Sequence, residues 1–241
     1  MVRPLVFGHR GASAVRRENT LAAFAKAREL GADGVELDVR RSADLQLVVH
    51  HDPEAEGLGL LAGTTFAAVR DTRPDIPTLD EALEACAGMI VNVEVKCLPW
   101  EPDSDAGDRA VVRAVVDLLQ RAEHVPLADV IVSSFDLGAV DAVRALAPEL
   151  ATGWLTTGQE VKAAAAMASE HGHPWLNADR TVALRTAPGD VDEAHRLGVR
   201  VNVWTVDDPA HMTALAAAGA DAIITNTPDV ALETLKDPRR G

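Results

Sequence analysis

Short runs of aliphatic and β-branched residues alternate along the chain with longer segments in which apolar residues recur at helical spacing. The short runs predict strands at residues 4–8, 34–39, 45–50, 89–95, 129–134, 150–155, 174–177, 199–204 and 221–225. The longer segments predict helices at residues 19–30, 78–87, 106–123, 136–146, 158–170, 189–197, 208–218 and 228–235. Because strand and helix alternate with short connections, the strands should run parallel with right-handed crossovers.

The first predicted helix shows how its ends are marked in the sequence. In NTLAAFAKARELG, residues 19–31, Asn19 is a candidate N-cap, and apolar residues then follow at helical spacing as far as Gly31. The segments VDEAHRLG and AHMTALAAAG also end at a glycine, the residue best suited to the left-handed position that follows many helices. These boundaries support the prediction of helices between the strands.

The repeated strand–helix pattern predicts the fold class. About eight such units in 241 residues match the size of a (β/α)8 barrel, the TIM barrel. An open, doubly wound sheet is the competing topology. No low-complexity linker divides the chain, so residues 1–241 are expected to form a single domain. The stretch 52–77 is longer than a barrel loop requires and predicts a small insertion over one face.

Composition narrows the classes of partner. The formal net charge is −14 and no stretch is rich in lysine or arginine, which argues against nucleic acid and anionic membrane surfaces as partners. Cys86 and Cys97 lack the spacing of a metal site, and two cysteines do not make a disulfide scaffold. The first ten residues hold too short an apolar run for a signal peptide, and no run approaches the ~18 residues of a membrane span. The composition therefore predicts a cytoplasmic protein with no stable membrane insertion.

Polar residues occur in predicted strands at every second position. Segments 34–39 and 91–96 alternate aliphatic with polar residues, so the aliphatic side chains should face the helices and the polar ones the barrel interior. Glu36, Asp38 and Glu94 are three of these inward residues, and they lie towards the carboxyl ends of their strands. That edge is where barrel enzymes place their active sites. The three carboxylates are therefore expected to converge at one mouth of the barrel.

Three buried carboxylates need compensation. Like charges ~4 Å apart repel by roughly 4 kcal/mol at an effective dielectric of 20. Raised pKa values or a bound divalent cation would relieve this repulsion, and an oxygen-only ligand set favours Mg²⁺ or Ca²⁺. Any single carboxylate could instead form an ion pair with Arg10 or Lys96, but two cations do not neutralise three anions.

Two histidines end predicted strands near these acids. A lone histidine at a strand end is more often structural, but His9 and His51 together would place two imidazoles beside the carboxylates. Two imidazoles can divide acid and base roles near neutral pH. Arg10 and Lys96 supply positive charge suited to a phosphoryl group. Asp52 either orients an imidazole or caps the following loop.

The sequence resembles the glycerophosphodiester phosphodiesterase family. The resemblance rests on the segments HRGASAVRRENTLAAFAKARELGADGVELDVRRSADLQLVVHHD, IPTLDEAL, NVEVK, VNVWTVDD and GADAIITNTPD, which follow one another in the family's order. It implies a metal-dependent barrel enzyme that hydrolyses a small glycerophosphodiester to an alcohol and sn-glycerol 3-phosphate. The attacking oxygen is either water or the substrate's own neighbouring hydroxyl, as phospholipase C relatives suggest.

The resemblance also implies roles for individual residues. When the family's roles are carried over by position, one divalent ion is held by Glu36, Asp38 and Glu94. The acid/base histidines are then His9 and His51. The phosphate is contacted by Arg10 and Lys96, and the pocket is lined by Phe135 and Trp204. Which histidine is the acid is left open. The ENT segment, with Glu18 and Asn19, is expected to be mainly structural.

Departures from the family pattern bear on the leaving group. Arg17 stands where a proline is usual before ENT, and the loop after His51 lacks the threonine-rich run of many relatives. The family's preference for a particular alcohol leaving group is therefore the property that can least be carried over to this chain. A phospholipase D-like or lysophospholipid-cleaving activity is an alternative, with the stretch EGLGLLAG as the candidate apolar groove. A non-catalytic phosphate- or metal-binding barrel and sugar-phosphate isomerisation are further alternatives.

Overall fold

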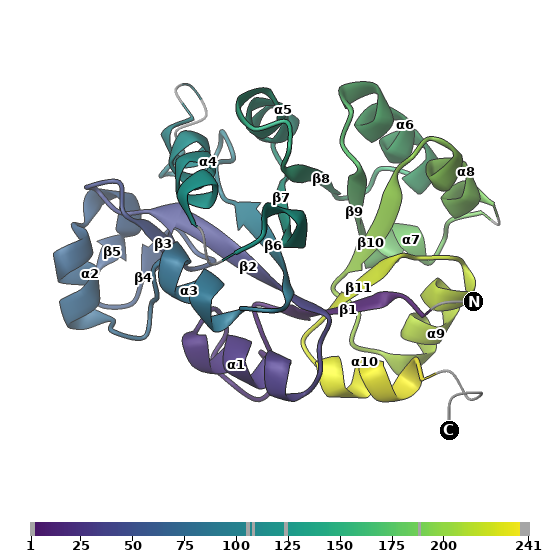
Figure 1. The fold of residues 1–241 in the computed structure, drawn as a ribbon, viewed down its shortest axis with the longest axis horizontal. Helices are drawn as coiled ribbons and strands as arrows, with labels where there is room; N and C mark the ends of the chain where they lie inside the picture. Colours follow the sequence, from purple (N-terminus) through teal and green to yellow (C-terminus); the bar gives the residue numbers. More distant parts are fainter. Residues whose placement is uncertain (1–2, 105–106, 108, 123–124, 188, 237–241) are drawn as a thin grey trace.

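The computed structural model describes residues 3–104, 107, 109–122, 125–187 and 189–236. Among these residues, eight parallel strands close into a barrel (Figure 1). Around the barrel the strands are β1 (Leu5–His9), β2 (Gly34–Arg41), β6 (Ile90–Val95), β7 (Val130–Ser134), β8 (Ala151–Thr156), β9 (Trp175–Asp179), β10 (Arg200–Trp204) and β11 (Ala222–Thr225). β1 pairs with both β2 and β11, which closes the sheet and excludes the open topology. The predicted TIM barrel is confirmed.

Helices connect the strands and cover the outside of the barrel (Figure 1). They are α1 (Leu21–Glu29), α3 (Leu79–Ala85), α4 (Ala110–Arg121), α5 (Leu137–Leu146), α6 (Val161–His171), α8 (Asp190–Arg196), α9 (Pro209–Ala217) and α10 (Pro228–Thr234). Each corresponds to a predicted helix; for α4 the predicted ends, 106 and 123, lie outside the described residues. Two short turns, η2 (Leu127–Asp129) and α7 (Arg180–Ala183), were not predicted. In the part of the chain that the structure describes, no helix is both long and apolar enough to cross a bilayer.

The barrel has apolar packing on its outside and, in its interior, near the amino-terminal ends of the strands. Outward residues of β2 and β6, among them Leu37 and Val93, pack against the surrounding helices. Inside, Phe7, Ile131 and Trp175 form an apolar plug near the beginnings of the strands. On β1, β2 and β6 the inward positions further along the strands are polar, so His9, Glu36, Asp38 and Glu94 lie above this plug at the carboxyl-terminal mouth.

The chain after β2 departs from the barrel repeat. β3 (Leu47–Val49) is shorter than predicted and pairs antiparallel with β2, so it extends the sheet without joining the closed barrel. The predicted insertion then forms β4 (Glu54–Ala55), β5 (Gly59–Leu60), η1 (Leu61–Gly63) and α2 (Phe66–Thr72), which lie beyond β3 at the left of Figure 1. A small apolar cluster of its own holds this insertion, with Val48, Leu61 and Val69 at its centre.

The start of α1 differs from its prediction. Thr20, not Asn19, is the N-cap, because its hydroxyl oxygen accepts a hydrogen bond from the backbone N–H of Ala23. Asn19 adopts left-handed backbone (φ 55°), and its side-chain amide donates to Asp38 instead. Both residue types can cap a helix, but only the asparagine amide can donate to a carboxylate. The end of α1 is as predicted, with Gly31 in the left-handed region at φ 87°.

Gly34 begins β2 at a point of close backbone approach. A Cβ there would meet the carbonyl oxygen of Ile90 and would lie 2.8 Å from the ring of Phe7. We therefore expect Gly34→Ala to lower the free energy of unfolding by about 1–3 kcal/mol through overpacking. Calorimetry should show a melting temperature lower by about 2–4 °C per kcal/mol. Gly63→Ala is the matched control, because a Cβ at Gly63 meets nothing within 4 Å; equal melting temperatures for the two variants would contradict this packing.

Candidate active site

Three carboxylates meet at the mouth of the barrel. Glu36 and Asp38 lie two residues apart on β2 and therefore face the same side, and Glu94 on β6 is paired in register with Asp38. One carboxylate oxygen from each lies within 4.8 Å of the others. Their exposed fractions are 3%, 1% and 6%. The sequence-based expectation that these side chains converge is met.

Two cations contact this carboxylate cluster of Glu36, Asp38 and Glu94. The Lys96 ammonium lies 2.9 Å from Asp38 Oδ1 and 2.5 Å from Glu94 Oε1. Arg10 Nε lies 3.2 Å from Asp38 Oδ2, and the Arg10 backbone N–H donates to Glu36 Oε2 at 3.0 Å. Within the described residues, both cationic side chains therefore converge on Asp38, while Glu36 has no lysine or arginine side chain within 4.0 Å.

The pKa values of the three acids reflect this uneven sharing. Burial and the neighbouring charges of Asp38 and Glu94 raise the pKa of Glu36 well above its ordinary value. Burial also raises the pKa of Glu94, although Lys96 opposes the shift. Burial disfavours the charge of Asp38 too, but Lys96 and Arg10 outweigh it and hold that pKa below its usual range. The cluster thus has more negative charge than its cations neutralise.

The residues present fit a hard divalent cation. All three candidate ligands are carboxylates, the donors that Mg²⁺ and Ca²⁺ prefer. A divalent ion would relieve the repulsion that raises the pKa of Glu36. Asn19 Nδ2 donates to Asp38 Oδ2 at 2.7 Å, which fixes the orientation of this carboxylate. The sequence predicted a mainly structural role for Asn19, and this contact shows that its side chain also reaches a carboxylate of the cluster.

His9 is the last residue of β1 and lies at the edge of the cluster. Its Nδ1 lies 2.7 Å from Asn226 Oδ1, and the Asn226 amide nitrogen donates to Asp207 at 2.7 Å, which fixes the amide oxygen towards the imidazole. Nδ1 must therefore carry the proton in neutral His9, and Nε2, 4.0 Å from Glu36 Oε2, has a free lone pair. Burial and the Arg10 charge lower the pKa of His9, so the neutral form is favoured.

His51 lies on the other side of the mouth, after β3. Its Nδ1 lies 2.7 Å from Asp52 Oδ1. The carboxylate oxygen accepts a hydrogen bond from Nδ1–H, which leaves Nε2 available. Asp52 thus orients the imidazole, one of the two roles left open by the sequence. Burial lowers the pKa of His51 and the charges of Lys96 and Arg10 act in the same direction, while the charge of Asp38 and the hydrogen bond to Asp52 oppose the shift. The pKa of each histidine is lowered, but Nδ1 of His51 faces a carboxylate, whereas Nδ1 of His9 faces an amide oxygen.

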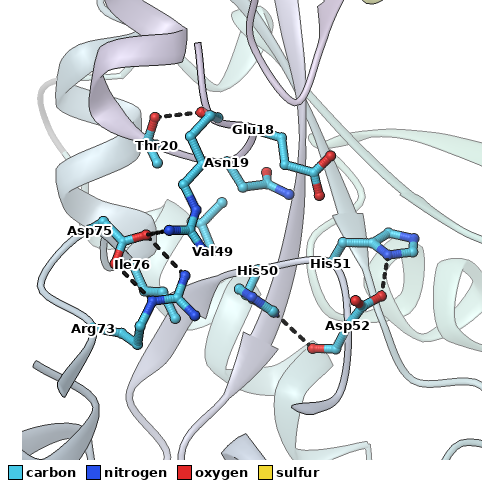
Figure 2. A pocket seen from close by; sticks show the side chains of 11 residues that line it. Glu18, Asn19, Thr20, Val49, His50, His51, Asp52, Arg73, Asp75 and Ile76 are labelled. Atoms are coloured by element: carbon cyan, nitrogen blue, oxygen red, sulfur yellow. Dashed lines mark hydrogen bonds and ion pairs between the residues drawn. The ribbon is translucent and has the colours of Figure 1, made fainter. Parts of the chain in front are cut away.

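A cavity of about 280 Å³ opens beside His51. Figure 2 shows His51 and Asp52 at one end of this cavity and Arg73 and Asp75 at the other. Arg17, the residue that replaces the usual proline, also lines it and forms an ion pair with Asp75 at 3.2 Å. The cavity therefore lies next to one of the two acid/base candidates, His51, and is lined largely by polar and charged residues.

Comparison with known proteins identifies the family of this chain. The model of the glycerophosphoryl diester phosphodiesterase family matches residues 9–230. The chain belongs to this family. A glycerophosphodiester phosphodiesterase of Caldanaerobacter subterraneus is 31% identical over 261 residues, which cover 98% of this chain and 99% of the relative. This chain is accordingly a phosphoric diester hydrolase.

Solved structures of related proteins show the same fold. The glycerophosphodiester phosphodiesterase of Thermotoga maritima aligns with a TM-score of 0.80 and 27% identity, covering 97% of this chain and 99% of the other. A phosphodiesterase of Oleispira antarctica, solved in complex with the product sn-glycerol-3-phosphate, aligns with a TM-score of 0.83 and 25% identity, covering 98% of each chain.

Phe135 and Trp204 lie next to each other in this phosphodiesterase. Their rings meet edge to face with centroids 5.4 Å apart, and the Lys96 ammonium lies 6.0 Å from the centre of the Phe135 ring. The Trp204 indole N–H donates to the backbone oxygen of Asn177 at 3.0 Å, which fixes the ring. Both aromatic residues are half-buried, so an apolar surface borders the charged cluster.

Arg40 is a residue of the site region that the sequence analysis missed. Its side chain is 1% exposed and continues the inward series of β2 after Asp38. Nε donates to the backbone oxygen of His51 at 2.7 Å, and the guanidinium pairs with Glu101 at 2.9 Å and Asp103 at 2.8 Å. The alternation Glu36, Asp38, Arg40 could have indicated that Arg40 points inward. Its acidic partners, however, lie in a loop that has no periodic pattern.

Arg40→Met is expected to destabilise the phosphodiesterase by about 3–5 kcal/mol, because it leaves buried charged partners without their cation. It should also lower activity, because the backbone of His51 loses its donor. Thermal melts and kcat on a glycerophosphodiester would measure both effects. Arg70→Met is the control: Arg70 pairs with Glu81, but the side chains are 36% and 40% exposed, and such pairs contribute little. A similar, small change in both variants would contradict the role given to Arg40.

Proposed function

We propose that the enzyme hydrolyses glycerophosphodiesters to an alcohol and sn-glycerol 3-phosphate with one divalent cation at the carboxylate cluster. The observation that carries this proposal is the convergence of three buried carboxylates, with oxygens within 4.8 Å of one another, beside two cations and two histidines. The Oleispira relative bound to sn-glycerol-3-phosphate supports the choice of product.

Glu36, Asp38 and Glu94 are the residues that would hold Mg²⁺ or Ca²⁺. Such an ion supplies Lewis acidity and neutralises charge on the phosphate oxygens. Arg10 and Lys96 border the same cluster, and we expect their positive charges to bind the remaining phosphate oxygens. These side chains together compensate the charge that develops as the phosphorus–oxygen bond breaks.

His9 is the proposed general base and His51 the proposed general acid. Asn226 holds the Nδ1 proton of His9, so Nε2 is free to take a proton from the attacking oxygen. Asp52 stabilises an imidazolium at His51, so Nε2–H of His51 can protonate the departing alkoxide. If water attacks, these two proton transfers complete the reaction. If the substrate's hydroxyl attacks, the resulting cyclic phosphate needs a second pair, in which His51 deprotonates water and His9 returns a proton to the oxygen that attacked, which again gives sn-glycerol 3-phosphate.

The insertion favours a small polar diester over a lysophospholipid. The stretch EGLGLLAG was the candidate groove for an acyl chain, but Leu61 is completely buried in the insertion's own apolar cluster. Leu58 packs against that same cluster. These leucines therefore stabilise the insertion and do not leave an open apolar channel of their own.

A chelator-reversed screen tests the proposed function. Enzyme freed of divalent ions would be assayed on glycerophosphocholine, glycerophosphoethanolamine, glycerophosphoglycerol and lysophosphatidylcholine, with phosphorus NMR to identify products. We expect activity only after Mg²⁺ or Ca²⁺ is restored, with sn-glycerol 3-phosphate as product and little turnover of the lysolipid. Full activity in excess chelator, or a preference for lysophosphatidylcholine, would overturn the proposal. A transient cyclic phosphate in the spectra would identify the substrate hydroxyl as the attacking group.

A further inference from the structure

A second group of potential metal ligands lies outside the barrel. Asp141 is on α5, His171 is the last residue of α6, and His173 follows two positions later. Asp141 Oδ1 lies 2.9 Å from His171 Nδ1 and 3.1 Å from His173 Nε2, and the three ligand atoms lie within 4.8 Å of one another. Because α6 ends where the chain enters β9, this His–His–Asp cluster is towards the strand beginnings, at the opposite end of the barrel from the carboxylate cluster.

Local backbone geometry brings the two histidines to one carboxylate. Gly172, between them, is the C-cap of α6 and adopts left-handed backbone at φ 77°. This turn lets an exposed helical residue and a buried loop residue point at the same oxygen. A Cβ at Gly172 would also contact the guanidinium of Arg144. Both the conformation and the space at this position therefore suit glycine.

The buried histidine is oriented by a second contact. His173 is 1% exposed, and its Nδ1 lies 2.8 Å from the hydroxyl of Thr152, an outward residue of β8 that is itself fully buried. With Nδ1 held there, Nε2 is directed at Asp141. Metal-ligating histidines are typically fixed in this way, with one ring nitrogen bonded to the protein and the other facing the ion.

We propose that Asp141, His171 and His173 form a binding site for a first-row transition ion of the zinc class. Two imidazole nitrogens and one carboxylate oxygen suit Zn²⁺, Co²⁺ or Ni²⁺ better than Mg²⁺ or Ca²⁺. Ligand atoms around tetrahedral Zn²⁺ lie roughly 3.3 Å apart, since each bond is about 2.0–2.1 Å long. The two distances to Asp141 Oδ1, 2.9 and 3.1 Å, are close to this value, and the ligand atoms of the three residues lie within 4.8 Å of one another.

The surroundings of the His–His–Asp cluster leave room for a fourth ligand to the ion. The side chains of Asp141 and His171 are 41% and 32% exposed, so a water molecule has access to a fourth position. Arg144 lies beside Gly172 and its positive charge opposes a cation. In the competing interpretation, both imidazoles simply donate hydrogen bonds to Asp141 and bind no metal. The bound ion would join α5 to the segment between α6 and β9, so its effect should be on stability.

Zinc binding by tag-free, chelator-treated enzyme tests the proposal, with Mg²⁺ in excess to occupy the carboxylate cluster. Calorimetry should show one more zinc equivalent for the wild type than for His171→Asn or Asp141→Asn. At a hundredfold excess over Kd, zinc at this site should add about 5–10 °C to the wild-type melting temperature, and this contribution should be absent from both variants. Any zinc bound by the active-site histidines binds to the wild type and to the variants alike, so it cancels in the comparison.

His195→Asn is the matched control. His195 Nε2 lies 2.8 Å from Asp221 Oδ2 and is 38% exposed, so it is a similar histidine–aspartate pair without a second imidazole. It should bind zinc as the wild type does. Equal zinc stoichiometry and equal melting response in wild type and His171→Asn would overturn the site. If His171→Asn does not show the wild-type circular dichroism spectrum, Asp141→Asn provides the same comparison.

Discussion

His9→Gln is expected to lower kcat by about 10²–10⁴-fold, the usual contribution of a general base. Glutamine fills a similar volume and can still bond to Asn226, but it cannot accept the proton of the attacking oxygen. Steady-state kinetics on metal-replete enzyme would measure the loss, and Mg²⁺ binding by calorimetry should be unchanged. Turnover at the wild-type rate would remove His9 from the mechanism.

His51→Gln should lower kcat by a similar factor, about 10²–10⁴-fold, but in a way that depends on the leaving group. An alkoxide such as that of choline needs a proton as it departs, whereas p-nitrophenolate leaves without one. His51→Gln should therefore lose far less activity on a p-nitrophenyl diester than on glycerophosphocholine, and His9→Gln should lose activity on both. The opposite pattern would exchange the two roles.

Glu36→Gln is expected to have opposite effects on stability and activity. Without a divalent ion, the change removes one of three close negative charges, and a glutamine oxygen can still accept from the Arg10 backbone N–H. The variant should therefore melt higher than the wild type in chelator, by about 2–4 °C for each kcal/mol of repulsion removed. Its activity should fall by more than about 10²-fold, because it loses a ligand of the ion.

The pH dependence of this stabilisation follows from the raised pKa of Glu36. The unfolded chain loses the Glu36 proton near the ordinary pKa of glutamate, while the folded protein retains it to higher pH. The folded state therefore binds more protons in this window, and wild-type stability in chelator falls as pH rises through it. The advantage of Glu36→Gln should be absent near about pH 4 and increase towards neutral pH. Thermal melts across this range measure it; a constant or reversed difference would contradict the charge distribution described here.

Periodicity was sufficient to predict the barrel and the convergence of its acids. Alternation on β2 and β6 assigns Glu36, Asp38 and Glu94 to the interior, and parallel strands bring their carboxyl ends to one edge. The register that pairs Asp38 with Glu94 was not predictable, because several offsets keep the same alternation. The helices were predicted well for a related reason, since each buries one apolar stripe against the sheet.

Contacts between loops could not be predicted from the periodicity of the sequence. Asn19 binds Asp38 while the neighbouring Thr20 caps α1, although both residue types are common N-caps and asparagine is the more favoured of the two. Asn226, which orients His9, comes from the far end of the chain, where it closes the barrel beside β1. The elements of the insertion are too short to show a period, so only its extent was predicted.

The central claim is that Glu36, Asp38 and Glu94 bind one divalent ion. Calorimetric titration of Mg²⁺ into chelator-treated wild type, Glu94→Gln and Asp179→Asn tests it most directly. Asp179 ends β9, and its side chain accepts from the backbone of Thr181, so it is a carboxylate outside the cluster. We predict one Mg²⁺ per chain for wild type and Asp179→Asn, and an affinity lower by more than about 10²-fold for Glu94→Gln. Unchanged binding by Glu94→Gln would contradict the account.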